Sequence, residues 1–295
     1  DHLRGNEMFK LEYGDMTDSS SISSILSKYK PTEIYNLAAQ SHVQVSFTTP
    51  EYTAESDGIG LLRLLESVRS LEIKTKIYQA STSELYGDVT DGLAQNEDTP
   101  FNPVSPYAAA KLYAFNIAKI YRDAYSMHIS NGILFNHESP RRGENFVSRK
   151  ISVGVAKIYH GIEKKISLGN LNSMRDWGHA RDYCDAMWKI MQLDSPIDLV
   201  ISSGKTSSVR EFVELAFKEI NIEIRWEGSG LDEKGIDASS RAILVDVKKE
   251  YFRPLEVGYL LGDSARAKKI LGWSPSTSLD ELVKEMVQAD IELLK

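Results

Sequence analysis

Short apolar runs and amphipathic helical segments alternate along the first half of the chain. The pattern at 33–38 is typical of a buried strand, whereas Leu61, Leu64, Leu65 and Val68 recur at the spacing of one helix face. Strands that alternate with helices predict a parallel sheet with helices on both faces. We therefore expect an α/β fold with a doubly wound, Rossmann-like parallel sheet. The expected strands are 9–13, 33–38, 76–81 and 129–135, and the expected helices are 19–30, 50–68 and 107–125.

The alternation becomes less regular beyond residue 145. The pattern there predicts a smaller mixed α/β lobe, so we expect one domain over 1–145, to which some later segments return, and a second lobe that is mainly 146–295. We expect residues 170–177 to form a loop. The other expected elements are strands at 165–168, 198–202, 222–226 and 242–247, and helices at 147–159, 180–193, 208–220, 264–271 and 279–294.

Tyr107 and Lys111 form the first candidate chemical unit. Ser105 is typical of a helix N-cap and Pro106 of the first helical position, so the two side chains fall one turn apart on the same face. An ammonium beside a phenol favours the ionised form of the phenol, whose ordinary pKa is about 10. Such a pair can move a proton on or off an alcohol near neutral pH. The spacing alone is a weak signal, because about one such pair is expected by chance, and an ordinary amphipathic helix face is the alternative.

Small and polar residues follow three of the expected strands. Asp15 comes after the first strand, residues 37–41 after the second and residues 81–84 after the third. Because the carboxyl ends of parallel strands meet at one edge of a sheet, these residues predict a dinucleotide-binding crevice there. Asp15 could accept a hydrogen bond from an adenine amine, although a turn or cap role is the alternative.

Composition places the chain among ordinary globular proteins. It has 295 residues, 42% of them hydrophobic and 26% charged, and no apolar run approaches the roughly 20 residues that span a bilayer. We expect a soluble protein. The formal net charge of −7 argues against a general nucleic-acid binder.

The cysteine and histidine content narrows the chemistry further. Cys184 has no second cysteine with which to form an intrachain disulfide, which suits a reducing compartment such as the cytoplasm. It lies within an expected helix, where we expect an inert, packed thiol. The six histidines show no ligand spacing, so we expect no metal.

Several longer motifs are far more specific than the Tyr-x-x-x-Lys spacing. They are NLAA at 36–39, STSE at 81–84, YAAAK at 107–111, LFNHESPRR at 134–142, LGN at 168–170, RDWGH at 175–179 and YFRPLEV at 251–257. In these motifs the chain resembles the extended short-chain dehydrogenase/reductase superfamily and, within it, the GDP-mannose 4,6-dehydratase family. The resemblance covers essentially the whole chain.

The resemblance implies a hydro-lyase that converts GDP-mannose to GDP-4-dehydro-6-deoxymannose with tightly held NADP. Tyr107, supported by Lys111, would take the proton of the C4 hydroxyl as hydride leaves C4, and Thr82 would hydrogen-bond the same oxygen. The C4 ketone acidifies the C5 hydrogen, which Glu84 could remove before it protonates the departing C6 hydroxyl. Hydride then returns to C6.

Glu84 distinguishes a dehydratase from the other enzymes that share this fold. An epimerase or a simple dehydrogenase needs the tyrosine, the lysine and the hydroxyl residue, whereas elimination also needs an acid/base at C5 and C6. A solvated loop carboxylate is the alternative role for Glu84.

The resemblance also implies binding residues and an assembly. Arg175 and Arg253 suit bidentate contacts to a diphosphate, although either alone is more often a surface ion pair. A homodimer or homotetramer is expected. The implied cofactor-binding residues are Asp15, Met16, Leu37, Ala38, Ala39, Gln40, Ser41, Tyr52, Lys111, His137 and Arg142. The implied residues for the GDP portion are Asn136, Lys150, Arg175, Arg253 and Glu256.

The family pattern includes a segment that is not in this sequence. The family begins with a strand and a Gly-x-x-Gly-x-x-Gly turn whose amides hold the pyrophosphate, followed by an arginine-bearing segment that selects the 2′-phosphate. The present sequence begins at what resembles the third strand of such a domain. The choice of NADP over NAD therefore depends on the resemblance alone.

Two alternatives stay open from the sequence. One is another nucleotide-sugar dehydratase, epimerase or reductase of the same superfamily. The other is a non-catalytic protein that keeps the fold and binds a sugar nucleotide without turnover.

Overall fold

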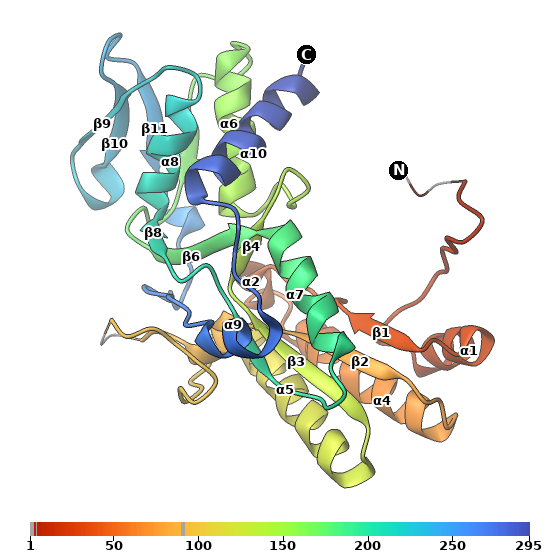
Figure 1. The fold of residues 1–295 in the computed structure, drawn as a ribbon. Coiled ribbons are helices and arrows are strands. Elements are labelled where there is room, and N and C mark those ends of the chain that lie inside the picture. Colours follow the sequence, from red (N-terminus) through yellow and green to blue (C-terminus); the bar gives the residue numbers. More distant parts are fainter. Residues whose placement is uncertain (1–2, 4, 90–91) are drawn as a thin grey trace.

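A four-stranded parallel sheet forms the centre of the first body of the molecule (Figure 1). The computed structural model describes residues 3, 5–89 and 92–295. The strands lie in the order β1-β2-β3-β7, and every pairing is parallel. Ile34, Ile77 and Ile129 stand side by side in register, so the apolar runs of neighbouring strands share one face. The strands are β1 (Glu33–Asn36), β2 (Lys76–Thr82), β3 (His128–Leu134) and β7 (Leu199–Ile201).

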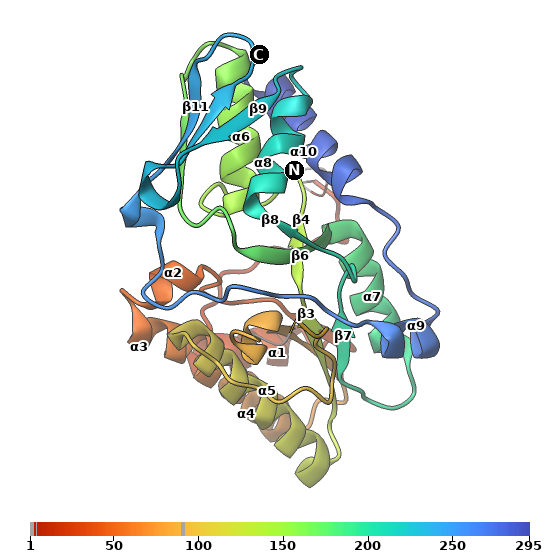
Figure 2. The same cartoon turned by 90° about the vertical axis from the view of Figure 1, so that its left-hand side faces the viewer.

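Helices cover both faces of this sheet (Figure 2). Ile77 packs in a core with α1, α4 and α5, whereas its neighbour Tyr78 packs in a separate core with α7 and α9. Successive residues of a strand point to opposite faces, so the two cores lie on opposite sides of β2. The expected doubly wound α/β fold is confirmed. The helices are α1 (Ser19–Tyr29), α4 (Gly60–Ser70), α5 (Pro106–Tyr125), α7 (Ala180–Gln192) and α9 (Ala265–Leu271).

A second body packs helices against a mixed sheet in the order β5-β11-β10-β9. Its core joins residues of α6, α8 and α10 with residues of β5 and β11. Arg149 of α6 and Asp290 of α10 form a buried ion pair within it, with Nη2 and Oδ1 2.7 Å apart. The elements are α6 (Val147–Tyr159), α8 (Val209–Lys218), α10 (Leu279–Leu293), β5 (Ile166–Leu168), β9 (Ile224–Glu227), β10 (Lys234–Asp237) and β11 (Ile243–Val247).

A three-stranded sheet in the order β4-β6-β8 lies between the two bodies (Figure 1). The expected loop at 170–177 is wrong, because β6 (Met174–His179) occupies much of it and pairs with β4 (Asn136–Glu138) and β8 (Thr206–Ser208). Arg175, Asp176 and His179 fill buried positions of β6. Since polar residues take the inward positions, the hydrophobic pattern gives no sign of this strand. β4, β8 and β10 are likewise absent from the sequence prediction.

The expected strand at 9–13 is also wrong. The segment forms neither helix nor strand, and no strand among the described residues pairs with it. Leu11 is 82% exposed, and Tyr13 is fully exposed. A strand exists only where a neighbour supplies ladder hydrogen bonds, which an apolar pattern alone cannot provide. Figure 1 shows this segment leading from the N-terminus towards α1, away from the sheet.

Local signals define the helices well. Ser105 caps α5 by accepting a hydrogen bond from the Ala108 N–H at 3.1 Å. The remaining short elements are α2 (Val43–Ser46), α3 (Pro50–Thr53), the π-helical turn η1 (Ala54–Ile59) and the 3₁₀ turns η2 (Ser83–Tyr86), η3 (Gly230–Asp232) and η4 (Lys249–Tyr251). In the described part of the chain, no helix combines the length and apolar character needed to cross a membrane.

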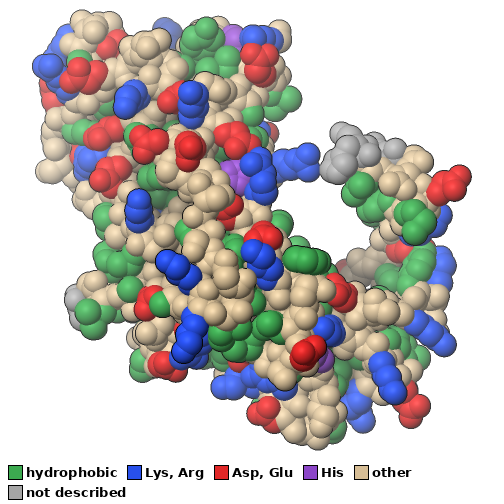
Figure 3. Space-filling view, in the orientation of Figure 1, with side chains coloured by type: hydrophobic (Ala, Val, Ile, Leu, Met, Phe, Trp, Pro, Cys, Tyr) green, Lys and Arg blue, Asp and Glu red, His purple; other side chains and the backbone are tan. Residues whose placement is uncertain are grey.

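The surface carries charges of both signs (Figure 3), and Cys184 is part of this surface. Charged side chains of both signs are interspersed on the face seen in Figure 3. Cys184 lies on α7 as expected but is exposed, so the expectation of a packed thiol is wrong. The buried face of α7 contains Tyr183, Met187 and Ile190, and Cys184 falls off this i, i+4, i+7 stripe.

Candidate functional site

A cleft of about 820 Å³ opens at the carboxyl ends of β1, β2 and β3 and extends towards the second body. Its walls include residues that follow each of these strands, together with residues of α6, β6 and the segment after β11. Such an edge is where ligands bind in doubly wound sheets. The cleft therefore lies where the sequence predicts the crevice.

Most of the residues that the sequence singles out line this cleft. Asp15, Met16, Ala38, Gln40 and Tyr52 are not among its lining residues. The predicted residues that do line it are Leu37, Ala39, Ser41, Thr82, Glu84, Tyr107, Lys111, Asn136, His137, Arg142, Lys150, Arg175, Arg253 and Glu256.

The Tyr107–Lys111 pair lies deep in the cleft on α5. Tyr107 is 8% exposed and Lys111 is 3% exposed. Lys111 Nζ donates to the Ala80 carbonyl at 3.2 Å and lies 5.9 Å from the centroid of the Tyr107 ring. Thr82, at the end of β2, lies close enough to Tyr107 to lower the pKa of its phenol. The structure thus gathers these polar groups at one point.

The acid–base balance of this pair differs from the sequence prediction. Burial raises the pKa of Tyr107, and the nearby Thr82 opposes this only in part. Burial also lowers the pKa of Lys111, which Asp57 opposes. The pKa of Tyr107 is therefore raised in this structure, not lowered as the spacing from Lys111 predicts, because removal from water disfavours both charges.

Glu84 is buried and faces a group of alternating charges. Arg253 Nη1 donates to Glu84 Oε1 at 3.5 Å and lies 3.7 Å from Glu256 Oε1. Arg175 Nη2 donates to Glu256 Oε1 at 2.8 Å. Glu84 Oε2 is buried without a hydrogen-bond partner among the described residues. Because Glu84 is only 8% exposed, the alternative of a solvated loop carboxylate does not hold.

Arg175 is a buried cation, not a surface ion pair. It is 6% exposed, and burial lowers its pKa while Glu84 opposes this. A buried guanidinium with carboxylates beside it can exchange one anionic partner for another. The two arginines and two glutamates therefore form a place where a diphosphate could be held.

His137, Glu138 and Arg142 form the wall contributed by β4 and the turn after it. His137 Nδ1 lies 2.9 Å from the Phe135 carbonyl, and burial lowers the pKa of this imidazole to about 4. Arg142 Nε lies 3.1 Å from Glu138 Oε2, and its guanidinium is 3.6 Å from the centroid of the Phe146 ring. At neutral pH the wall therefore presents a neutral imidazole beside a paired guanidinium.

Lys150 marks the far end of the cleft. Its Nζ lies 3.2 Å from the centroid of the Tyr251 ring, in a cation–π contact. Burial lowers its pKa, and Glu250 opposes this. Asn136 of β4 lines the same cleft, so the predicted residues for the GDP portion share one space with the catalytic candidates.

Asp15, Gln40 and Ala38, which are predicted site residues outside the cleft lining, make local hydrogen bonds. Asp15 is exposed, and its Oδ1 accepts from both the N–H and the hydroxyl of Thr17 at 2.8 Å. The Gln40 side chain donates to Thr53 Oγ1 at 3.2 Å. Tyr52 is 54% exposed. Met16 is half-buried, and the Ala38 N–H donates to the Asn36 side chain. The turn role considered for Asp15 is therefore present in the structure, and its binding role stays a prediction.

The sequence pattern does not single out Asp57. Its Oδ1 accepts from the Gln40 N–H at 2.7 Å, and the residue is 2% exposed. The available signal is a carboxylate between Ser56 and Gly58 inside an expected helix. Carboxylates are seldom buried without a specific partner.

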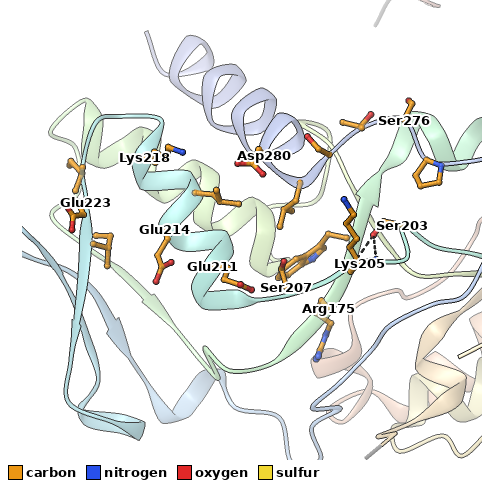
Figure 4. Close-up of a pocket in the computed structure, with 18 of the residues that line it drawn as sticks. Arg175, Ser203, Lys205, Ser207, Glu211, Glu214, Lys218, Glu223, Ser276 and Asp280 are labelled. Carbon is orange, nitrogen blue, oxygen red and sulfur yellow. Dashed lines mark hydrogen bonds between the residues drawn. The ribbon is translucent and has the colours of Figure 1, made fainter. Parts of the chain in front are cut away.

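A second cavity, of about 1090 Å³, lies between α8 and the segment that leads into α10 (Figure 4). Lys205, Glu211, Glu214 and Lys218 line it. Arg175 also borders it, but Figure 4 shows the Arg175 side chain directed away from these residues. The cavity contains none of the other residues predicted to act in catalysis or binding. The cleft at the strand ends is therefore the candidate site.

Comparisons with known proteins identify the family. A family model described as GDP-mannose 4,6 dehydratase matches residues 1–286. GDP-mannose 4,6 dehydratase of Drosophila melanogaster is 57% identical over 294 residues, which are 99% of this chain and 74% of the relative. GDP-mannose 4,6-dehydratase of Sinorhizobium fredii is 56% identical over 97% of this chain and 82% of the relative.

Solved structures show the same fold at lower identity. The structure of RMD from Pseudomonas aeruginosa, complexed with NADPH, superposes with a TM-score of 0.81 at 19% identity, and the match covers 95% of this chain and 88% of that chain. The family resemblance read from the motifs is thus confirmed, and the chain belongs to the GDP-mannose 4,6-dehydratase family.

Proposed function

We propose that this chain catalyses the dehydration of GDP-mannose to GDP-4-dehydro-6-deoxymannose. The observation that carries the proposal is the position of Glu84, two residues after Thr82 and in the same cleft as Tyr107. Family membership supports the substrate and the reaction. Oxidation alone needs Tyr107 and Thr82, whereas loss of water also needs a carboxylate such as Glu84.

The cofactor of this proposal is NADP, which, when bound in the cleft, would supply the hydride chemistry between C4 and C6 of the hexose. The cleft has features that fit a dinucleotide. Its lining includes the small residues Ala39 and Ser41 after β1, and the buried Ser81 hydroxyl has no hydrogen-bond partner among the described residues. A small side chain and an unpaired hydroxyl at a strand end suit close approach of a polar ligand. Leu37, His137 and Arg142 would bind it with them.

Tyr107 and Thr82 act at the C4 oxygen. Tyr107 takes the hydroxyl proton as C4 is oxidised, while Thr82 hydrogen-bonds the same oxygen. Lys111, when charged, lowers the cost of the phenolate. Because the pKa of Tyr107 is raised in this structure, the phenol must first lose its own proton to solvent before it accepts the proton of the C4 hydroxyl. It is then suited to return the proton when the reaction needs an acid.

Glu84 acts at C5 and C6. The C4 ketone acidifies the C5 hydrogen, Glu84 removes it, and the protonated carboxyl then gives a proton to the C6 hydroxyl as this leaves as water. A solvent-derived proton returns to C5 when C6 is reduced. No net redox change occurs.

Arg175, Arg253 and Glu256 hold the GDP portion in this proposal, with Asn136 and Lys150. The arginines would exchange Glu84 and Glu256 for diphosphate oxygens. We also propose that residues 1–145 form the cofactor domain and 146–295 mainly the sugar-nucleotide lobe. The active assembly would be a homodimer or homotetramer.

The test is the mass of the product formed from GDP-mannose and NADP in deuterated water. Loss of one water together with one deuterium at C5 is the expected result. Glu84→Gln should keep nucleotide binding and lose dehydration. Glu144→Gln changes another cleft carboxylate and should leave turnover intact. Unchanged turnover in Glu84→Gln would contradict the assignment.

A further inference from the structure

A buried carboxylate lies behind the Tyr107–Lys111 pair. Asp57 is 2% exposed and belongs to η1, a π-helical turn. π-Helical turns are rare in proteins, and those that occur are often found at functional sites. We propose that Asp57 is a positioning residue that keeps Lys111 charged and anchors the 37–41 loop, a role that rests on the function proposed above.

One oxygen of Asp57 anchors the loop after β1. Oδ1 accepts from the Gln40 N–H at 2.7 Å and from the Ser56 hydroxyl. Hydrogen bonds to a carboxylate are stronger than those between neutral groups. Because Ala39 and Ser41 flank Gln40 and line the cleft, this bond sets the position of the backbone at the cleft wall.

The packing of η1 brings Asp57 beside the helix of Lys111. Gly58 follows Asp57 and contacts α5 so closely that a Cβ there would lie 3.3 Å from the carbonyl oxygen of Ala110. Ala110 precedes Lys111 on the helix. A side chain at position 58 would therefore require η1 or α5 to shift by a few tenths of an ångström.

Lys111 needs a counter-charge at this depth. It is 3% exposed, and its Nζ donates to the neutral Ala80 carbonyl at 3.2 Å. Removing an ammonium from water is costly unless an opposite charge lies close by. Asp57 acts on Lys111 electrostatically, and its Oδ2 is buried without a hydrogen-bond partner among the described residues.

The surrounding charges fix the direction of the effect. Burial lowers the pKa of Lys111, and Asp57 raises it. Burial raises the pKa of Tyr107, to which Asp57 and Glu84 add and which Arg142 opposes. Removing the charge of Asp57 therefore lowers the pKa of both Lys111 and Tyr107.

The first test is the pH profile of kcat/KM for Asp57→Asn, which keeps an oxygen for the Gln40 N–H but removes the charge. Both limbs of the profile should move to lower pH, by about one unit. Glu55→Gln removes the same charge from the same turn, but its side chain is 50% exposed, so its profile should stay in place. Coincident profiles for Asp57→Asn and the unchanged chain would overturn the proposal.

The second test is a thermal-unfolding cycle, which needs no turnover. Asp57→Asn leaves Lys111 without its counter-charge, whereas Asp57→Asn with Lys111→Met removes both charges. We expect the double variant to unfold at a higher temperature than Asp57→Asn. If Asp57→Asn does not fold, recovery of a folded double variant supports the proposal equally. A double variant no more stable than Asp57→Asn overturns it, whether or not the proposed reaction is correct.

Discussion

Arg253 donates to Glu84 across the cleft at 3.5 Å, although 169 residues separate them in the chain. The same guanidinium lies 3.7 Å from Glu256, which also accepts from Arg175. In the proposed function, a diphosphate must compete with these carboxylates for the arginines. Its arrival would then release Glu84 for its acid–base role.

Arg253→Lys tests this competition. Lysine keeps the positive charge but loses the planar fork that matches a phosphate. We expect the KM for GDP-mannose to rise about tenfold, equivalent to about 1.4 kcal/mol of binding free energy, with a smaller change in kcat. Steady-state kinetics measures both. Arg266→Lys changes an arginine that pairs with Asp98 at 40% exposure, and it should leave KM unchanged. An unaltered KM in Arg253→Lys would remove Arg253 from the substrate site.

Tyr107→Phe tests the proton transfer at C4. The substitution keeps the ring in its buried position and removes the hydroxyl, so we expect kcat to fall by about 10²–10⁴-fold while nucleotide binding persists. Tyr113→Phe, on the same helix at 38% exposure, is the matched control and should retain full kcat. A loss of less than tenfold in Tyr107→Phe would mean that another group moves the proton.

The helices could be predicted closely because their signals are local. Ser105 and Pro106 indicate where α5 begins. Helix geometry then places Tyr107 and Lys111 one turn apart on the same face. The order of alternating strands and helices likewise predicts the parallel sheet and the edge at which its cleft opens. These inferences need only neighbouring residues and general topology.

The parts that could not be predicted depend on residues far apart in the chain. β6 is held by pairing with β4 and β8, and its buried positions carry polar side chains that give no apolar alternation. The direction of the Tyr107 pKa depends on burial, which a four-residue spacing does not reveal. The partnership of Asp57 with Lys111 arises only when η1 packs on α5. Sequence motifs therefore indicate which residues gather, and the fold decides their protonation.

The pH dependence of unfolding tests the neutral state of His137. Its ring stacks on Tyr183 with centroids 4.9 Å apart, and burial lowers the pKa of the imidazole from 6.5 to about 4. Between these values the unfolded chain binds a proton that the folded chain does not. The free energy of unfolding should therefore fall as the pH drops through this window, by at most about 3.5 kcal/mol from this residue.

His137→Phe isolates that contribution. Phenylalanine keeps a ring against Tyr183 but cannot titrate, so the variant should lose less stability than the unchanged chain between pH 6.5 and about 4. Denaturant unfolding at several pH values gives the free energy of unfolding of both chains as a function of pH. Subtracting one curve from the other cancels the contribution of the carboxylates that titrate in the same range. The loss of the hydrogen bond to Phe135 shifts the whole curve of the variant without changing its slope. Parallel curves would show that His137 is protonated as readily in the folded chain as in the unfolded one.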